Sequence, residues 1–296
     1  MDRRFGKVAV LKGGVSSERE ISLRSGAAIA QGLREGGYEV EEVDIVSREF
    51  TVPTGVEAVF VALHGEFGED GEIQQALAGL GLPFTGSGAE SCRVSFDKVL
   101  TRDRLEANGI PVPRGEVLTS AADLTIPVPL VVKPPREGSS VGIHIVSSEA
   151  GWEPAFADAV RFSGEALVEE YIPGRELTVG LVDGEVLPVV EILPASEWYD
   201  YEAKYVTGET QYAVPAELDA AVASELQSIA KKTFECLDAE GFGRVDFRLS
   251  PEGRPYVLEL NAIPGFTATS LLPKAAEAAG TGFSELCCRI MELAHL

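Results

Sequence analysis

The sequence predicts a mixed α/β and α+β architecture, and two features of the chain carry that prediction. Within residues 1–95, short apolar runs alternate with segments of helical periodicity, which is typical of a mostly parallel sheet. From residue 96 onward, apolar strands are joined by tight turns such as "DGE", which indicates antiparallel pairing. The length of 296 residues corresponds to two domains of roughly 150 residues each, or to three smaller ones.

The elements of the first region follow one another closely. A strand at 6–14 ends in two glycines, a helix covers 16–37, and two strands cover 38–45 and 57–65. A second helix is expected at 72–81. Ser17 and Glu20 have the spacing of a capping box, for which Glu18 is not needed. The helix dipole also favours an acid in a first turn, so a purely structural role for Glu18 stays open.

The second region contains longer helices and pairs of strands. A helix begins near residue 97, and two strands joined by a Gly/Ser loop cover 127–146. Further strands, joined by turns, occupy 166–193. Helices are expected at 216–238 and at about 284–293, on either side of a hairpin.

The composition excludes several classes of partner. A formal net charge of −22 argues against nucleic acid and against anionic membranes, since both favour a basic surface. No apolar run approaches the ~20 residues that cross a membrane, and the first residues do not have the pattern of a signal peptide. We therefore expect a cytoplasmic protein whose four cysteines are reduced.

Residues 244–265, "RVDFRLSPEGRPYVLELNAIPG", predict a hairpin with one functional face. Strict alternation places residues 244, 246 and 248 on one face of the first strand, and residues 257, 259 and 261 on one face of the second. Folding the hairpin at 252–253 brings Asp246 close to Glu259. With Asn261 they form an oxygen-only set, which suits Mg²⁺ or Mn²⁺ better than zinc. Arg244 beside them is suited to an oxyanion. A solvated edge hairpin is the alternative.

The Gly/Ser loop in "KPPREGSSVGI" has the character of a phosphate-binding loop. Lys133 ends a strand, and Gly138, Ser139, Ser140 and Gly142 follow, so that backbone amides can approach an anion closely. The spacing differs from that of a Walker A loop. An ordinary hairpin turn explains the same residues equally well.

Two further stretches carry weaker signals. In "EEYIPGRE", Glu169 and Glu176 flank a Pro-Gly turn, where they could contact a purine edge and ribose hydroxyls, although exposed acids are common in so acidic a chain. His64 ends "VFVALHG" and opens into the glycine-rich "GEFGEDG", at the kind of strand end where α/β domains bind ligands. A hydrogen-bonded structural histidine is the alternative.

Taken in order, the motifs resemble one family. "GGVSSEREIS", "ALHGEFGEDG", "PFTGSG", the "DK" at 97–98, "VKPPREGSSVG", "EEYIPGRE", "YDYEAKY", "GRVDF" and "LELNAIPG" are similar to those of the D-alanine–D-alanine ligases, in the ATP-grasp superfamily. The resemblance covers essentially the whole chain. It implies a Rossmann-like N-terminal substrate-binding domain at 1–95, a central ATP-grasp subdomain at 96–172 and a C-terminal catalytic subdomain at 173–296. The chain departs from many relatives at Lys12, Ala262 and Ile263.

The resemblance also implies an ATP site with two Mg²⁺ or Mn²⁺ ions. Asp246, Glu259 and Asn261 would hold the ions, and the loop at 138–142 would close over the phosphates. Adenine would lie against the segment 169–172. The implied ATP-binding residues are Lys98, Lys133, Glu137, Gly138, Ser139, Ser140, Val141, Glu169, Glu170, Tyr171, Ile172, Glu176 and Lys204.

The same resemblance assigns the substrate residues. Glu18 would pair with the ammonium group of the first D-alanine, helped by His64, and Arg244 would stabilise the developing oxyanion. The implied catalytic residues are Glu18, Ser139, Tyr205, Arg244 and Ser270. The implied substrate-binding residues are Glu18, His64, Arg244, Gly265, Ser270 and Leu271.

The implied reaction is ATP-dependent formation of a dipeptide. ATP would phosphorylate one D-alanine carboxylate, and the amine of a second D-alanine would attack the acyl phosphate, which supplies peptidoglycan precursors. The family further implies a homodimer. A ligase that joins D-alanine to D-lactate or D-serine is the nearest alternative, and Lys204 with Tyr205 favours the dipeptide type. A regulatory nucleotide-binding protein without chemistry is disfavoured, because the metal ligands and Arg244 are all present.

Overall fold

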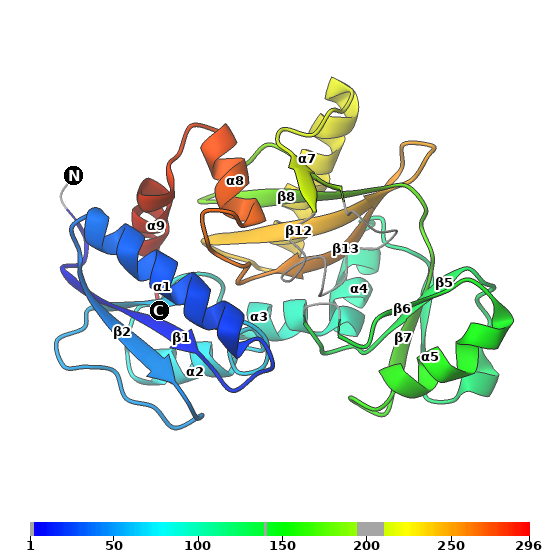
Figure 1. The fold of residues 1–296 in the computed structure, drawn as a ribbon, viewed down its shortest axis with the longest axis horizontal. Coiled ribbons are helices and arrows are strands. Elements are labelled where there is room, and N and C mark those ends of the chain that lie inside the picture. The colour runs from blue at the N-terminus through cyan, green and yellow to red at the C-terminus, as the bar shows by residue number, and fades with distance from the viewer. Residues whose placement is uncertain (1–2, 139–140, 194–209) are drawn as a thin grey trace.

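The structure is a computed structural model that describes residues 3–138, 141–193 and 210–296. Three sheets follow one another along the molecule, as Figure 1 shows. Their strand orders in the described residues are β2-β1-β3, β4-β7-β5-β6 and β11-β10-β8-β12-β13, with β9 paired to β8. The first sheet is parallel and the other two are antiparallel, which confirms the mixed architecture expected from the sequence.

The N-terminal sheet is built around β1 (Lys7–Gly13). This strand pairs with β2 (Glu39–Ile45) and β3 (Ala58–Val61) on either side. Helix α1 (Arg19–Glu35) connects β1 to β2, and α2 (Glu72–Gly79) follows β3. Every residue of β3 is buried, so packing around the strand fixes the position from which the following segment leaves the sheet.

The start of α1 differs from the expected capping box. The N-cap residue is Glu18, and no side chain caps the helix, so the pairing of Ser17 with Glu20 is not used. Ser16 provides the local order instead. Its hydroxyl accepts from the backbone N–H of Glu18 at 3.2 Å and donates to the carbonyl of His64 at 2.6 Å. The turn before α1 is thereby tied to the end of β3.

The central sheet forms the green end of the molecule in Figure 1. Its strands are β4 (Gly115–Leu118), β5 (Leu130–Lys133), β6 (His144–Val146) and β7 (Ala166–Glu170). Helix α5 (Trp152–Ala159) shares an apolar core with this sheet. Two short 3₁₀ turns complete the unit, Ala121–Asp123 and Glu149–Gly151.

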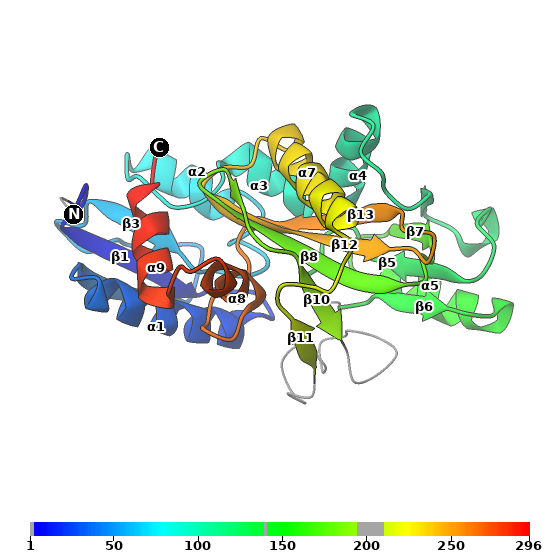
Figure 2. The same ribbon diagram turned by 90° about the horizontal axis from the view of Figure 1, so that it is seen from above.

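Three of the described helices cover one face of the C-terminal sheet, and α8 (Leu271–Ala278) packs against β8 on the other face, as Figure 2 shows. Its strands are β8 (Arg175–Val182), β9 (Glu185–Val186), β10 (Val190–Leu193), β11 (Gln211–Ala213), β12 (Phe242–Leu249) and β13 (Pro255–Asn261). The covering helices are α3 (Ala89–Phe96), α4 (Lys98–Ala107) and α7 (Ala220–Cys236). Helix α3 has no counterpart among the expected elements, whereas α4, α7 and the hairpin do.

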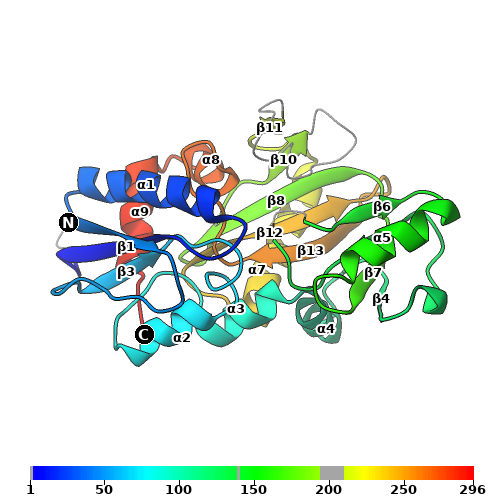
Figure 3. The ribbon, with the colours of Figure 1, turned by 60° about the horizontal axis from the view of Figure 1, so that its bottom comes forward.

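The end of the chain returns to the N-terminal sheet. Helix α8 is followed by α9 (Phe283–Glu292), which packs against α1 through a core that includes Ile29 and Ile290. Figure 3 shows α9 beside α1 at the same end of the molecule. The division at residues 95 and 172 stays a prediction, because the last helix and the first share one core.

Two expectations from composition can be compared with the described residues. None of their helices combines the length and the apolar character needed to cross a membrane. All four cysteines, at 92, 236, 287 and 288, are free thiols.

The structure explains the lysine at position 12, because its ammonium group pairs with Glu42 while its stem lies against Gly26. A side chain larger than glycine at residue 26 would collide with Lys12 Cβ, at 2.4 Å.

Candidate active site

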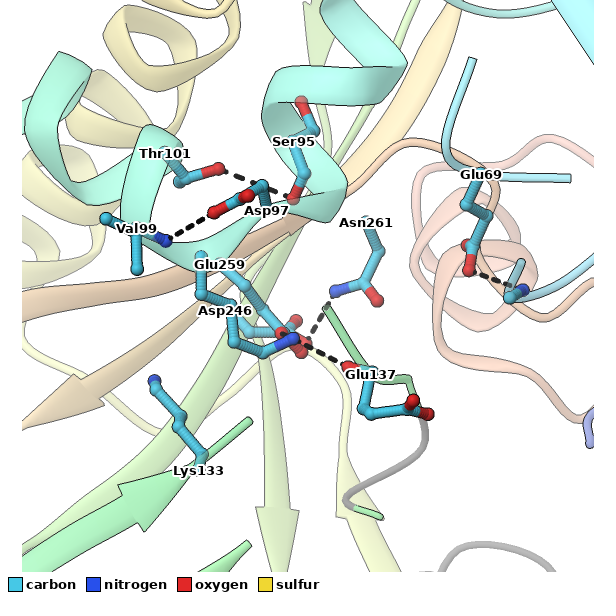
Figure 4. Close-up of polar contacts among 12 residues, drawn as sticks. Glu69, Ser95, Asp97, Val99, Thr101, Lys133, Glu137, Asp246, Glu259 and Asn261 are labelled. Atoms are coloured by element: carbon cyan, nitrogen blue, oxygen red, sulfur yellow. Dashed lines mark hydrogen bonds and ion pairs between the residues drawn. The ribbon is translucent and has the colours of Figure 1, made fainter. Parts of the chain in front are cut away.

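A row of polar side chains crosses the face of the C-terminal sheet that is turned away from α7. On β12, Asp246 lies opposite Glu259 of β13 on one side and opposite Thr178 of β8 on the other. Arg244 lies opposite Asn261. The predicted opposition of Asp246 and Glu259 is therefore confirmed by the strand register, and Figure 4 shows their side chains gathered with that of Asn261.

A β-bulge corrects the expected alternation of β13. The register shifts after Asp246, so that Phe247 pairs with Val257 and Leu258 is an extra residue. The expectation that Val257 shares a face with Glu259 is wrong, because Val257 is 1% exposed and packs in the core beneath the sheet. Because of this extra residue, Val257 faces the core while Glu259, two positions later, lies on the polar face.

Asp246 accepts hydrogen bonds from three neighbouring side chains. Arg244 donates two parallel hydrogen bonds to its carboxylate, from Nε to Oδ1 and from Nη2 to Oδ2, both at 2.8 Å. Thr178 donates its hydroxyl to Oδ1 at 2.6 Å, and the amide of Asn261 donates to Oδ2 at 2.9 Å. These bonds fix the direction of the carboxylate, since a forked arginine contact and a short hydroxyl bond together leave it little freedom.

The donor set fits a divalent cation that prefers oxygen. Asp246 and Glu259 contribute carboxylates, and Asn261 keeps its amide oxygen while its nitrogen bonds to Asp246. Within the described ranges no group of three or more His, Cys, Asp and Glu side chains is arranged to hold a metal ion. The assignment of Asp246, Glu259 and Asn261 to a metal ion stays a prediction.

Lys98 connects this row to the Gly/Ser loop. Its ammonium group donates to the carbonyl of Glu137 at 2.7 Å and lies 3.6 Å from Glu259. Lys98 is the first residue of α4, whose N-cap Asp97 accepts from two backbone amides of that helix and from Arg136 at 2.6 Å. The ammonium group of Lys98 therefore contacts both the base of the Gly/Ser loop and one of the candidate metal ligands.

A first pocket, called here the Tyr171 pocket, lies between the central and C-terminal sheets. Its lining combines apolar side chains, which suit a base, with charged side chains, which suit a ribose and phosphates. Its lining includes Lys98, Pro113, Val131, Lys133, Ile143, Glu169, Glu170, Tyr171, Ile172, Glu176, Ile192, Arg244, Asp246, Arg248, Leu258 and Glu259.

Buried ion pairs order the walls of this pocket. Lys133 lies 2.7 Å from Glu169, and both side chains are more than nine-tenths buried. Arg102 of α4 approaches the other oxygen of Glu169 at 3.7 Å. On the opposite wall Arg248 lies 3.4 Å from Glu176. Because buried charges are costly unless they are paired, these contacts hold the acids in fixed positions.

A second pocket, called here the Glu18 pocket, adjoins the first. Its lining includes Glu18, His64, Glu69, Ser95, Phe96, Lys98, Glu137, Gly138, Arg244, Glu259, Leu260, Asn261, Ala262, Ile263, Pro264 and Gly265. Two glycines are needed for close approach to its acid. A Cβ atom would lie 2.7 Å from Glu18 Oε2 at Gly65 and 2.4 Å from it at Gly138. The Gly/Ser loop therefore meets the start of α1 directly.

His64 lines the Glu18 pocket, but both of its ring nitrogens already have partners. Nδ1 lies 2.9 Å from the carbonyl of Ile263, and Nε2 lies 3.0 Å from the hydroxyl of Ser25. That hydroxyl also accepts from the backbone N–H of Phe266 at 3.1 Å. Burial lowers the pKa of His64, which favours the neutral ring. The histidine therefore connects the N-terminal sheet to the chain that leaves β13.

In the lining of the Glu18 pocket, acids outnumber lysine and arginine side chains by two to one. Burial, reinforced by the negative charge of Glu18, raises the pKa of Glu69 well above the usual range of a carboxyl group. Burial also raises the pKa of Glu137. Glu69 accepts from the backbone N–H of Gly65 at 2.7 Å, and Figure 4 shows it apart from the hairpin residues.

The residues expected to take a second carboxylate lie beside this pocket. Ser270 is the N-cap of α8, so Leu271 begins a helix whose free N–H groups favour an anion. The Ser270 hydroxyl accepts from the backbone N–H of Thr267 at 2.9 Å. It would lie 3.7 Å from a Cβ atom at Gly265, which does line the pocket.

The structure brings most of the predicted residues into the two pockets. Among the described ones, Val141, Ser270 and Leu271 line neither pocket. Ser139, Ser140, Lys204 and Tyr205 lie outside the described residues. Two charged lining residues were not predicted, Glu69 and Arg248. The glycine-rich setting of Glu69 and the alternation that places Arg248 beside Asp246 were the available signals.

Comparison with known proteins gives a consistent result across the chain. A family model described as "D-ala D-ala ligase C-terminus" matches residues 107–292. A D-alanine–D-alanine ligase of Syntrophotalea carbinolica is 45% identical, over 98% of this chain and 96% of the relative. A namesake from Methylacidiphilum infernorum is 43% identical, over 98% of this chain and 95% of the relative.

Solved structures agree with these relatives. A crystal structure of D-alanine–D-alanine ligase from Bacillus anthracis matches with a TM-score of 0.88 and 34% identity, and covers 97% of each chain. A structure of the same ligase complexed with ATP matches with a TM-score of 0.85 and 31% identity, again over 97% of each chain.

Proposed function

Because the chain belongs to the family of D-alanine–D-alanine ligases, we propose that it joins two D-alanines while ATP is converted to ADP and phosphate. The family prediction from sequence is thereby confirmed, as is the prediction that the protein is a ligase. The reaction would pass through an acyl phosphate of the first D-alanine.

The contact between the two pockets is the observation that carries this proposal. Lys98, Arg244 and Glu259 line both pockets, so a phosphoryl group at the end of a nucleotide in the Tyr171 pocket would face the Glu18 pocket. Positioning of this kind supplies much of the rate in phosphoryl transfer. The Tyr171 pocket includes apolar side chains suited to a base, and the excess of acids over side-chain cations in the Glu18 pocket suits an ammonium group.

The described residues support separate roles in the first step. Glu18 would bind the ammonium group of the first D-alanine and orient its carboxylate toward the shared edge of the pockets. Lys98 would hold the transferring phosphate against the loop base. Arg244 would stabilise the negative charge that develops on the carboxylate oxygen. Asp246, Glu259 and Asn261 would hold two Mg²⁺ or Mn²⁺ ions, which when bound neutralise phosphate oxygens.

The second step would use the far side of the Glu18 pocket. Gly265, Ser270 and the N-terminus of α8 would hold the carboxylate of the second D-alanine, so that its amine faces the acyl phosphate. Ser139 and Tyr205 would link to Glu18, and Lys204 would reach the transferred phosphate, in line with the resemblance of their sequence motifs. The adenine would lie against residues 169–172, with Glu176 on the ribose.

The cellular role follows from the reaction. We place the enzyme in the cytoplasm, as a homodimer, where the dipeptide would enter peptidoglycan precursors. The chain's acidic surface fits small-molecule substrates and gives no support to a nucleic-acid partner.

The decisive experiment measures phosphate release and identifies the product by mass spectrometry. The purified protein receives ATP, Mg²⁺ and D-alanine, alone or together with D-lactate or D-serine. D-alanyl-D-alanine as the main product in every mixture supports the proposal. A preferred depsipeptide or D-alanyl-D-serine would establish the alternative ligase. Nucleotide binding without phosphate release under any of these conditions would indicate the regulatory class.

A further inference from the structure

Arg248 is the residue of β12 at one end of the polar row. It lies directly opposite Glu176 across the β8–β12 ladder, two residues from Asp246 on the same face. The side chains of Arg248 and Glu176 are 12% and 16% exposed, so their charges are largely removed from water. Opposite charges that face one another on adjacent strands stabilise their register and fix each other's direction.

The guanidinium group of Arg248 contacts three residues around one turn. Its Nε donates to the carbonyl of Ile172 at 3.1 Å, and Nη1 lies 3.4 Å from Glu176 Oε2. Its Nη2 lies 3.4 Å from the hydroxyl of Tyr171, whose ring centroid is 5.7 Å from the guanidinium carbon. One rigid, planar group therefore connects the residues on both sides of the Pro-Gly turn at 173–174.

We propose that Arg248 is a positioning residue that sets Glu176 and the segment 171–172 for the ribose and base of a bound adenine nucleotide. This inference rests on the proposed use of ATP and adds a determinant of nucleotide specificity to it. With Oε2 held by Arg248, the Glu176 carboxylate would present a defined edge to the ribose hydroxyls. A forked donor does this better than a lysine, whose ammonium group fixes no plane.

The position of Arg248 in the row argues against a direct contact with the terminal phosphates. The two pockets share Arg244, Lys98 and Glu259, which marks the phosphate end. Arg248 is four residues along β12 from Arg244, which corresponds to about 13 Å in an extended strand. Its effect should therefore belong to the nucleoside.

The first test compares ligands with different numbers of phosphates. Calorimetry measures binding of adenosine, ADP and ATP, without Mg²⁺, to the wild type and to Arg248→Met and Arg248→Lys. We expect both variants to weaken binding of the three ligands by a similar factor of about ten, or ~1.4 kcal/mol. Arg254→Met is the matched control, because Arg254 is an exposed arginine of the same hairpin, and it should bind like the wild type.

Two results of this test would overturn the inference. A loss that grows from adenosine to ATP would show that Arg248 acts through its charge on the phosphates. Wild-type binding by Arg248→Lys would show that the forked geometry is not needed. Thermal melting of each variant establishes that it is folded, and the lysine variant supplies the test if the methionine variant does not fold.

The second test measures the preference for ribose. Ligase assays with ATP, 2′-deoxy-ATP and 3′-deoxy-ATP give the ratio of kcat/KM values, and Arg248→Met should reduce the preference for ATP several-fold. The KM for D-alanine should not change. In a Glu176→Gln background the same substitution should alter the preference less than twofold, and an undiminished effect would contradict positioning through Glu176.

The controls separate this inference from the proposed function. A wild type that neither binds adenosine nor forms a dipeptide would contradict the proposed function itself. An active wild type, together with an Arg248→Met variant of unchanged preference, would contradict the role of Arg248 alone.

Discussion

The two pockets that meet at the hairpin treat their carboxylates in opposite ways. In the Tyr171 pocket, Asp246, Glu169 and Glu176 lie 2.8, 2.7 and 3.4 Å from arginine or lysine nitrogens. In the Glu18 pocket, burial raises the pKa of both Glu69 and Glu137, so the surroundings oppose their negative charge. Lysine and arginine side chains nearly match the acids in number in the Tyr171 pocket, whereas acids outnumber them by two to one in the Glu18 pocket.

This difference shows how a strongly acidic chain can bind both an anion and a cation. With a net charge of −22, unbalanced acids beside a polyphosphate would repel it, and local pairing removes that repulsion. An ammonium group has the opposite need: in a water-poor pocket it is attracted by carboxylates, and its own positive charge would favour the ionised form of these acids. The pairing also fixes the nucleotide-side acids in position before a ligand arrives.

The largest expected effect comes from removing charge where the pockets meet. Glu259→Gln keeps the size of the side chain but removes the charge of a proposed metal ligand, so we expect turnover to fall by more than the ~100-fold typical of substitutions that only disturb a ligand's hydrogen bonds. Phosphate release at millimolar Mg²⁺ measures this. Glu252→Gln, at the exposed turn of the same hairpin, is the control. Turnover near the wild-type rate for Glu259→Gln would remove Glu259 from the metal site.

The next prediction concerns the acidic side of the comparison. Glu18→Gln should raise the KM for the first D-alanine by about 10–100-fold, since a shielded ammonium–carboxylate contact contributes about 1.5–3 kcal/mol. The KM for ATP should change far less, because Glu18 lines only one of the two pockets. Glu20→Gln, exposed in the same helical turn, is the control. Equal changes in both constants would refute the assignment of Glu18.

A smaller effect should follow from loosening a fixed acid without removing it. Thr178 is 1% exposed and donates its hydroxyl to Asp246 at 2.6 Å. Thr178→Val should raise the Mg²⁺ concentration needed for half-maximal activity by about tenfold, because the hydroxyl that orients the proposed ligand Asp246 is lost. Thr178→Ser retains the hydroxyl and should behave like the wild type. An unchanged Mg²⁺ requirement in the valine variant would mean that Arg244 and Asn261 suffice to orient Asp246.

The sequence predicted the elements whose patterns are local. The parallel strands of the first sheet, helix α7 and the opposition of Asp246 to Glu259 all follow from periodicity and turn residues. Helix α3 was not expected, because eight residues, "AESCRVSF", are too few for a clear period. The bulge at Leu258 was not predicted either, because a strand sequence with one extra residue still has the composition of an uninterrupted strand.

Residues whose roles depend on distant partners could not be predicted. Arg248 lies on the expected face of β12, but its partner Glu176 comes from β8. A local pattern does not predict the pairing of strands that are some seventy residues apart. Glu69 lies in a glycine-rich loop where no periodicity gives a side chain its direction. His64 stood at the expected strand end, whereas its bonds to Ile263 and Ser25 depend on how the chain after β13 returns.

The raised pKa of Glu69 makes a prediction about stability and pH. A carboxyl group whose native pKa lies above its unfolded value binds more protons in the native state. Its contribution to stability is therefore complete below about pH 4.5 and is lost as the pH rises through the native pKa. Each unit of difference between the two pKa values corresponds to about 1.4 kcal/mol.

Glu69→Gln is the smallest perturbation of the comparison, because it keeps an oxygen for the Gly65 amide and removes only the titration. The free energy of unfolding of the variant, relative to the wild type, should rise between pH 5 and pH 8. Urea denaturation at both pH values measures this difference, and Glu66→Gln, exposed in the same loop, controls for net charge. A difference that stays constant or falls with pH would show that Glu69 is no more disfavoured as an anion in the native protein than in the unfolded chain. In that case the acidic side of the site would be as well balanced as the nucleotide side, and the contrast between the two pockets would not hold.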